Sequence, residues 1–485
     1  MFIKESNDLA FVDFNGKDHS YKEFLSNIKK YSSLYDDLGG KNVLVLSENR
    51  PEWLYSFFSI WNNKGVVVSI DANSTPDEIS YVLNDSSPEM IFCTNGTKET
   101  VDKALEKLDS YDGHVKIINI DNIVLEELNE KNQEYRTPLG DELAAMLYTS
   151  GTTGNPKGVM LSFNNLLSNM TGIIEREIIT SIDQTLALLP FHHVLPLMVT
   201  LVVVYSGASI VFVPKIASHE ILEALGKNRV TILVGVPRVY KLFYDGIKDQ
   251  IQSKFITRKI YDMTSVIKSM KIRKTIFKKV HTKFGGHLKQ MISGGAKLDP
   301  EIGDFFERLG FYVTEGYGLT ETSPILAVAT IKERKIGTVG KLLPKTEIKI
   351  VEDELLVKGP QVMLGYYKNL EKTREVLTED GWFKTGDLAE MDSEGYLTIK
   401  GRKSSMIVLS NGKNIDPETI ENKILNISKN LIDEIGIVAK NEKLNAIVVP
   451  NLLEFRKQGK NNIQQYVKEI IEDYNLDATA YKKVL

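Results

Sequence analysis

Alternation of short apolar runs with longer amphipathic stretches is the feature that most constrains the fold of this chain. Runs of strand length occupy Val43–Leu46, Met90–Cys93 and Val230–Val234, while Pro76–Leu83 and Thr100–Leu108 show helical periodicity. A helix between two strands returns the chain to the same end of a sheet, so that the strands pair in parallel. The alternation therefore predicts an α/β fold with largely parallel sheets.

Size and charge limit the protein's class. A chain of 485 residues with 42% hydrophobic content is too long for one compact unit and should form two to four subdomains. Its 60 basic and 64 acidic residues nearly cancel, so we expect no nucleic-acid partner. Cys93 is the single cysteine, which excludes an intramolecular disulfide and favours a reducing, cytoplasmic location. The longest apolar run, Val194–Val204, is shorter than the roughly 18 residues that span a bilayer.

Composition also suggests where the chain divides. From about Glu352 onward short strand-and-turn units replace the alternating pattern, and a last α/β segment follows Gly401-Arg402-Lys403. We therefore expect a large N-terminal domain over residues 1–402 and a small α+β C-terminal domain over residues 403–485. Within the large domain, α/β subdomains should reach to about residue 340 and a β-rich subdomain should cover about 341–402.

One segment departs from the overall charge balance. Residues 254–289 carry many lysines and arginines with Asp262 as the only acid, interleaved with apolar residues at roughly helical spacing. We favour a solvated helical face packed on a domain. Peripheral contact with anionic lipid is the alternative.

A loop rich in glycine and hydroxyl groups carries the first chemical signal. The string Tyr148-Thr149-Ser150-Gly151-Thr152-Thr153-Gly154-Asn155-Pro156-Lys157-Gly158 offers backbone N–H groups, hydroxyls and one lysine to phosphate oxygens. Pro156 stands where a Walker A loop needs its second glycine, so the P-loop NTPase spacing is absent. The loop therefore predicts a polyphosphate site of another kind.

Five further strings follow in order and complete a pattern. They are Leu189-Pro190-Phe191-His192-His193, Ile292-Ser293-Gly294-Gly295-Ala296, Gly316-Tyr317-Gly318-Leu319-Thr320-Glu321-Thr322, Lys384-Thr385-Gly386-Asp387 and Gly401-Arg402. Together with the loop they resemble the motifs of the adenylate-forming superfamily over nearly the whole chain. Long-chain and medium-chain acyl-CoA synthetases look most similar, from Asn49-Arg50-Pro51-Glu52-Trp53 and from Val408–Ile415.

The resemblance implies a role for each motif. It implies that ATP phosphates are held by Thr149, Ser150, Gly151, Thr152, Thr153, Gly154 and Lys157, and that Glu321 is the carboxylate of a Mg²⁺ site. It implies that adenine contacts Gly294, Gly295, Ala296, Glu315, Gly316, Tyr317 and Gly318. Asp387 suits the ribose hydroxyls, Arg402 can bridge ribose and phosphate, and Thr320 is placed near the α-phosphate. One of the two histidines is expected to face the acid, and we assign His193 to it, while a core position stays open for His192. Gly412 is expected to line the path of CoA.

The reaction that the resemblance implies is activation of a carboxylic acid, expected to be a medium-chain or long-chain fatty acid, as acyl-AMP, followed by transfer to the thiol of CoA. The small C-terminal domain should swing about its hinge between these steps. An acyl-carrier protein as acceptor and release of the adenylate are the alternatives among enzymes. Two departures from the family pattern, Ser404 at the hinge and the lack of a C-terminal catalytic lysine before Leu485, keep a nucleotide- and acyl-binding pseudoenzyme open.

Overall fold

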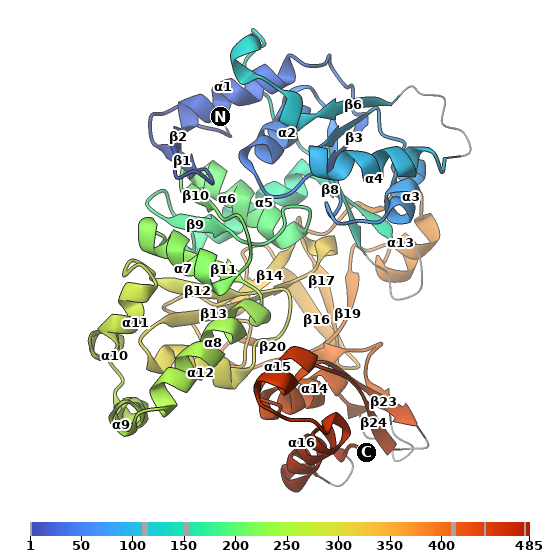
Figure 1. Cartoon of the computed structure of the whole chain (residues 1–485). Coiled ribbons are helices and arrows are strands. Elements are labelled where there is room, and N and C mark those ends of the chain that lie inside the picture. Colours follow the sequence, from blue (N-terminus) through green and yellow to red (C-terminus); the bar gives the residue numbers. More distant parts are fainter. Residues whose placement is uncertain (1, 109–114, 150–155, 409–413, 441–442, 480–481) are drawn as a thin grey trace. The chain divides into compact units, whose positions relative to one another are not determined.

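The computed structural model describes residues 2–108, 115–149, 156–408, 414–440, 443–479 and 482–485 (Figure 1). The chain divides into two compact units. The first comprises Met1–Ile348, Val357–Phe383 and Asp392–Leu397, and the second comprises Lys349–Leu356, Lys384–Met391 and Thr398–Leu485. The predicted boundary between residues 402 and 403 stays a prediction.

A seven-stranded sheet forms one layer of the first unit, in the strand order β18-β8-β7-β4-β3-β5-β6. Its strands are β3 (Asn42–Leu46), β4 (Val66–Ser69), β5 (Met90–Cys93), β6 (Lys116–Asn119), β7 (Leu143–Thr149), β8 (Lys157–Ser162) and β18 (Gly365–Tyr366). Strands β7, β4, β3, β5 and β6 pair in parallel, whereas β8 and β18 are antiparallel to their neighbours. The predicted parallel strands at Val43–Leu46 and Met90–Cys93 are confirmed.

A nine-stranded sheet forms the other layer, in the order β15-β14-β13-β12-β11-β9-β10-β1-β2. Its strands are β1 (Leu9–Val12), β2 (Asp18–Ser20), β9 (Gln184–Ala187), β10 (Ser209–Phe212), β11 (Ile232–Gly235), β12 (Gln290–Ser293), β13 (Tyr312–Gly318), β14 (Ile325–Val328) and β15 (Lys341–Leu342). The centre is parallel and both edges are antiparallel. The parallel centre places the ends of β9, β11 and β12 at one edge of the sheet, where the predicted motifs follow them.

Helices cover both sheets. They are α1 (Tyr21–Ser32), α2 (Pro51–Asn62), α3 (Pro76–Ser86), α4 (Asn95–Leu105), α5 (Phe163–Glu175), α6 (Val194–Ser206), α7 (Ser218–Lys227), α8 (Pro237–Gln252), α9 (Phe255–Met263), α10 (Met270–Ile276), α11 (Lys278–Lys283), α12 (Pro300–Arg308) and α13 (Leu370–Val376). Helices α3 and α4 bury Ile79 and Val101 against β3, β4 and β5, and α7, α8 and α12 bury a second core that includes Tyr240 and Phe306. Within the described residues every helix is too short or too polar to span a bilayer.

The helix predicted from Thr100 begins earlier, at Asn95. Thr94 caps it: its hydroxyl accepts the Thr97 N–H, and the Thr97 hydroxyl accepts the Thr94 N–H, so two N–H groups at the helix start are satisfied. Val194–Val204, which the sequence left open between an acyl-tunnel wall and a buried helix, lies in helix α6, whose side chains are mostly buried.

The second unit is smaller and has its own core. Strands β16 (Glu347–Val351), β17 (Glu354–Lys358), β19 (Phe383–Met391) and β20 (Leu397–Arg402) form a sheet in that order, and its chain also contributes β21 (Ile407–Val408), β22 (Asn414–Ile415), β23 (Ile432–Lys440) and β24 (Lys443–Pro450). Helices α14 (Pro417–Ile427), α15 (Leu452–Lys457) and α16 (Ile463–Asp477) complete it. Buried Ile424, Phe455 and Ile471 from the three helices share one core with the β23-β24 hairpin. The predicted α/β fold class with a smaller C-terminal part is confirmed.

Candidate active site

Strands β7 and β8 bracket the predicted phosphate loop. Thr149 ends β7, Lys157 begins β8, and the two residues face each other across the antiparallel pair. The loop is therefore anchored at both ends in two neighbouring strands of the seven-stranded sheet. Ser150, Gly151, Thr152, Thr153 and Gly154 lie outside the described residues.

Tyr366 joins the loop lysine to the predicted metal carboxylate. The Lys157 ammonium lies 5.0 Å from the centre of the Tyr366 ring, and the Tyr366 hydroxyl donates a hydrogen bond of 2.8 Å to Glu321 Oε1. Tyr366 reaches this place because β18 pairs with β8 and sets it opposite Val159, two residues beyond Lys157. The structure thus brings Lys157 and Glu321, which are far apart in sequence, to one buried aromatic side chain.

Glu321 stands on a short 3₁₀ turn, η4 (Thr320–Thr322), that is held from several sides. The Met363 N–H donates to the Glu321 carbonyl at 2.9 Å. Buried Asn169 of α5 donates to the Ile325 carbonyl at 2.8 Å and accepts the Ile325 N–H at 3.1 Å. A Cβ at Gly318 would lie 1.8 Å from the Pro324 carbonyl oxygen, so only glycine permits this tight return of the chain. Both Thr320 and Glu321 are therefore placed by a rigid turn.

The predicted adenine edge lies where β12 and β13 run in parallel. Gly294, Gly295 and Ala296 follow β12 directly, and Gly316, Tyr317 and Gly318 end β13. A Cβ at Gly294 would come within 3.0 Å of Leu195 and 3.8 Å of the Gly316 carbonyl oxygen, so the two motifs are close neighbours. Gly295 has φ +79°, which favours glycine. The arrangement exposes backbone groups with little side-chain obstruction.

Glu315 has a different environment from the other residues of this edge. Its carboxylate accepts the Leu298 N–H at 3.3 Å, and burial raises the pKa of this group to about 7. Glu315 therefore ties the segment after β12 to β13 through its side chain. Its predicted contact with adenine stays a prediction.

Two histidines stand at the start of α6. Their rings lie 4.0 Å apart, His192 is largely buried 3.9 Å from Asp71, and His193 is exposed at the N-cap of the helix. Burial, with the neighbouring His193, lowers the pKa of His192 to about 4, so this imidazole is neutral at physiological pH. Asn49 fixes the turn that leads to the two histidines. Its side-chain amide donates to the Leu189 carbonyl at 2.7 Å and accepts the Phe191 N–H at 2.8 Å.

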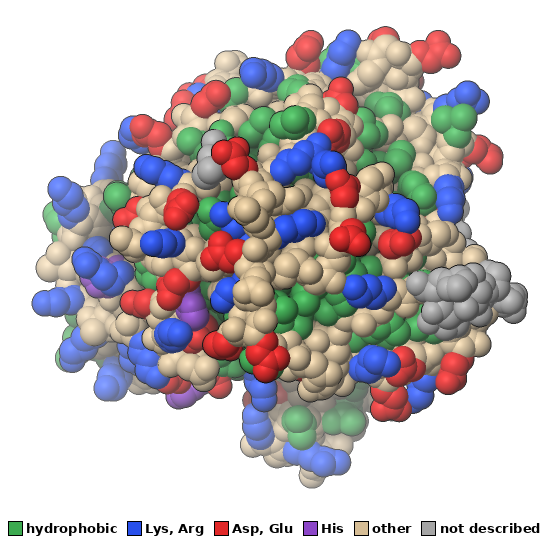
Figure 2. Space-filling view, turned by 90° about the horizontal axis from the view of Figure 1, so that it is seen from above, with side chains coloured by type: hydrophobic (Ala, Val, Ile, Leu, Met, Phe, Trp, Pro, Cys, Tyr) green, Lys and Arg blue, Asp and Glu red, His purple; other side chains and the backbone are tan. Residues whose placement is uncertain are grey.

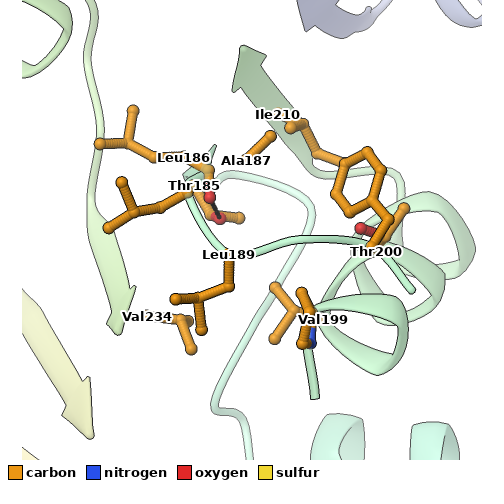
Figure 3. A pocket seen from close by; sticks show the side chains of 11 residues that line it. Thr185, Leu186, Ala187, Leu189, Val199, Thr200, Ile210 and Val234 are labelled. Atoms are coloured by element: carbon orange, nitrogen blue, oxygen red, sulfur yellow. Dashed lines mark hydrogen bonds between the residues drawn. The ribbon is translucent and has the colours of Figure 1, made fainter. Parts of the chain in front are cut away.

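An apolar pocket lies beside the histidines (Figure 3). The enclosed cavity is small, about 20 Å³, and its walls come from β9, β10, β11, α6 and the turn that follows β9. Figure 3 shows Leu189, Val199 and Val234 around the same space. Thr185 and Thr200 are the polar side chains in a lining that is otherwise aliphatic and aromatic. Such a lining suits an apolar ligand.

The second unit contains a separate group of predicted residues. Arg402 Nε lies 2.9 Å from Asp387 Oδ1, and the Arg402 guanidinium also donates to the Thr385 carbonyl at 3.2 Å. The Thr385 hydroxyl accepts the Asp387 N–H at 3.0 Å. Asp387 is buried and Arg402 is about half exposed, so the pair presents one fixed carboxylate beside one accessible cation. Gly412 lies outside the described residues.

Three residues were not predicted to act at the site: Tyr366, Asn169 and the side chain of Asn49. Asn49 belongs to a string that the sequence singled out, but its function in the Leu189–Phe191 turn was not foreseen. Tyr366 and Asn169 follow no local pattern. Their roles come from the pairing of β18 with β8 and from the packing of α5 on the η4 turn.

Comparisons with known proteins identify the family of this chain. The family described as AMP-binding enzyme matches residues 3–367, and the AMP-binding enzyme C-terminal domain matches residues 404–485. A long-chain-fatty-acid–CoA ligase of Mycobacterium bovis is 31% identical over 416 residues, which are 79% of this chain and 69% of that protein. A chloroplastic long-chain-fatty-acid–[acyl-carrier-protein] ligase of Arabidopsis thaliana is 27% identical and covers 93% of this chain and 75% of its own length.

Solved structures show the same fold. The ATP-bound MatB of Rhodopseudomonas palustris superposes with a TM-score of 0.77 at 24% identity, over 100% of this chain and 92% of that one. A fatty acyl CoA synthetase of Mycobacterium tuberculosis gives a TM-score of 0.71 at 21% identity, over 99% and 91%. With a family match that spans most of the sequence, the chain belongs to the AMP-binding enzymes.

Proposed function

We propose that this protein activates a fatty acid with ATP as acyl-AMP, releases pyrophosphate, and transfers the acyl group to the thiol of CoA. Relatives that are about 30% identical carry the names of long-chain-fatty-acid–CoA ligases, which supports the reaction class. The observation that carries the proposal is the contact of Lys157 and Glu321 with one tyrosine, Tyr366, because it brings together a cation and a carboxylate that we assign to phosphate and to Mg²⁺.

The residues around Tyr366, Lys157 and Glu321 are compatible with a Mg²⁺ site. Magnesium is usually bound by one or two carboxylates together with substrate phosphates and waters. Glu321 is partly exposed, its Oε1 is held by Tyr366, and no ion pair to its carboxylate occurs in the part of the chain that the structure describes. When bound, the ion supplies positive charge that stabilises the leaving pyrophosphate.

ATP fits the same unit at its glycine-rich edge. Backbone groups of Gly294, Gly295 and Gly316 would meet the purine, Tyr317 would offer its ring, and Lys157 would neutralise phosphate oxygens. For the second unit, the resemblance alone assigns Asp387 to the ribose hydroxyls of ATP and Arg402 to a phosphate. These assignments, with Ala296 and Glu315 at the edge and Thr149 to Gly154 in the loop, are part of the proposal.

The chemistry is two displacements. A carboxylate oxygen of the acid attacks the α-phosphorus, the bond from this phosphorus to the bridging oxygen breaks, and pyrophosphate leaves with that electron pair. The thiol sulfur then attacks the acyl carbonyl, AMP leaves, and the thiol proton passes to solvent or a base. Thr320 and Lys157 would stabilise charge on the phosphate, and exposed His193 at the N-terminus of α6 would orient the acid.

The apolar pocket supports a fatty acid as substrate. The cavity of about 20 Å³ is itself too small for an alkyl chain, so the support comes from its apolar lining beside the turn that carries His192 and His193 at the start of α6. Gly412 would line the path of CoA. A carrier protein is a second acceptor to test, since one relative is named as an acyl-carrier-protein ligase. The cytoplasmic location stays a prediction.

A direct test incubates the protein with ATP, Mg²⁺, a series of fatty acids from eight to eighteen carbons, and either CoA or an acyl-carrier protein. Mass spectrometry should detect AMP and a fatty acyl-CoA in amounts that depend on the acid. If the acyl group were transferred to the acyl-carrier protein and not to CoA, the acceptor of the second step would be a carrier protein. ATP binding without any AMP or thioester would contradict the proposal and favour a binding protein.

A further inference from the structure

A basic and apolar surface on the first unit serves none of the steps above. It consists of α9, α10 and the turn between them, over residues 254–276. Exposed apolar side chains on this surface are Phe255, Ile256, Ile260, Met263, Val266, Ile272 and Ile276, and exposed basic side chains are Lys254, Arg258, Lys259, Lys268, Lys271 and Lys274. Large exposed apolar groups gathered on one short segment mark an interaction site.

Helix α9 displays the pattern most clearly. Ile256, Ile260 and Met263 are spaced i, i+4 and i+7, so they form one stripe along the helix. All three are exposed, and Ile256 and Met263 keep 71% and 64% of their surface. Two turns of solvent-facing apolar side chains are unfavourable in water unless a partner covers them.

The opposite side of α9 is firmly docked. The Arg308 guanidinium lies 4.1 Å from the centre of the Tyr261 ring and donates to the Tyr261 carbonyl at 3.0 Å. Arg273 of α10 donates to the Ile267 carbonyl at 2.7 Å and to the Glu307 carbonyl at 3.0 Å. These bonds hold both helices on α12. The apolar stripe therefore lies on a helix that is fixed in place, and its side chains stay exposed in the folded protein.

Charge identifies the partner. Residues 254–289 hold eleven basic residues and one acid, Asp262, in a chain whose net charge is -4. Among the described residues, no ion pair involves Lys254, Lys259, Lys268 or Lys271. Lys and Arg side chains predominate along the left edge of Figure 2, the side on which α10 and α11 lie in Figure 1. A cationic face that also exposes large apolar groups complements an anionic lipid surface.

We propose that the basic and apolar surface of α9 and α10 docks on bilayers that contain anionic phospholipid. Ile256, Met263 and Val266 enter the boundary between headgroups and acyl chains, while the lysines contact phosphates. This contact goes beyond the ligase reaction and develops the alternative to a solvated helical face. The outer faces of the segment carry apolar groups that a solvated helix does not need.

Docking and acyl binding occupy different places. Helix α8 runs from the end of β11, where Val234 lines the apolar pocket, to the start of α9. With 16 residues, α8 is about 24 Å long at 1.5 Å per residue. The surface therefore concentrates the enzyme on lipid without forming the mouth of the pocket.

The test is sedimentation with vesicles of phosphatidylcholine alone or with about one third phosphatidylglycerol, in low and high salt. The full chain should bind the anionic vesicles at least tenfold more tightly than the neutral ones. Ile256→Gln with Met263→Gln should weaken this binding at least fivefold, and so should glutamine at Lys254, Lys259, Lys268 and Lys271. Ile182→Gln and Leu476→Gln are matched controls. Both side chains are more than 80% exposed, and neither belongs to the basic and apolar surface.

Thermal unfolding and turnover of a soluble eight-carbon acid in each variant separate lost docking from lost folding or lost ligase activity. Absence of vesicle binding by the unaltered protein would overturn the proposal. So would binding that Ile256→Gln with Met263→Gln leaves unchanged, since the apolar stripe would then have no part in it. Binding to an acidic carrier protein or to RNA, but not to vesicles, would assign the surface to a different partner and refute the lipid.

Discussion

Tyr366→Phe removes one hydroxyl and leaves the ring against which Lys157 lies. The lost group is the donor of the 2.8 Å hydrogen bond to Glu321 Oε1. A hydrogen bond to a charged group contributes about 1.5–3 kcal/mol, and since Glu321 is partly exposed, water should replace part of it and leave a loss of about 1–2 kcal/mol. If Glu321 holds the metal only when oriented, that loss raises the half-saturating Mg²⁺ concentration about 5- to 30-fold.

The assay is a Mg²⁺ titration of fatty-acid-dependent ATP–pyrophosphate exchange at saturating ATP. Tyr367→Phe is the matched control: the hydroxyl of Tyr367 has no hydrogen bond in the part of the chain that the structure describes, so its Mg²⁺ dependence should not change. A half-saturating concentration for Tyr366→Phe within twofold of the unaltered protein would refute the role given to this contact.

Three further substitutions test other parts of the account. Asn169→Leu removes both hydrogen bonds to Ile325 and should lower the free energy of unfolding by about 2–3 kcal/mol in urea denaturation, whereas Asn164→Leu on the exposed side of the same helix should change it little. Asp387→Ala should weaken ATP binding about tenfold or more by calorimetry, and unchanged affinity would remove the ribose assignment. Burial lowers the pKa of His281 to about 4. Between pH 6.5 and about 4 the unfolded chain therefore binds a proton at His281 that the folded chain does not bind, so the free energy of unfolding falls as the pH is lowered. His281→Gln should make this fall shallower, and an unchanged slope would contradict the burial argument.

Local patterns predicted the strands well and their order not at all. Val43–Leu46 is apolar at every position because β3 is covered on both faces, and this is visible in the sequence. Nothing local indicates that β1 and β2 extend the sheet of β10, or that β18 joins β8. Such pairings depend on contacts between segments far apart in sequence.

The candidate site residues also divide into those that local sequence patterns predicted and those that only the structure reveals. Compact strings of glycines, hydroxyls and acids singled out Thr149, Lys157, Glu321 and Asp387, because a loop that wraps phosphate needs several backbone N–H groups and hydroxyls within a few residues. Tyr366 remained hidden, since a tyrosine after a glycine has many structural uses and its role follows only from the strand pairing. The sequence predicted a small C-terminal domain over residues 403–485, but only the structure shows the ion pair between Asp387 and Arg402.

The central claim is that the contacting residues Lys157, Tyr366 and Glu321 support adenylation of a fatty acid. Exchange of labelled pyrophosphate into ATP, measured with Mg²⁺ and with or without a fatty acid, tests it most directly because it needs no thiol acceptor. The account predicts exchange that requires the acid and that Glu321→Ala lowers at least a hundredfold. Exchange that is absent with every acid, or that Glu321→Ala leaves unchanged, would contradict it.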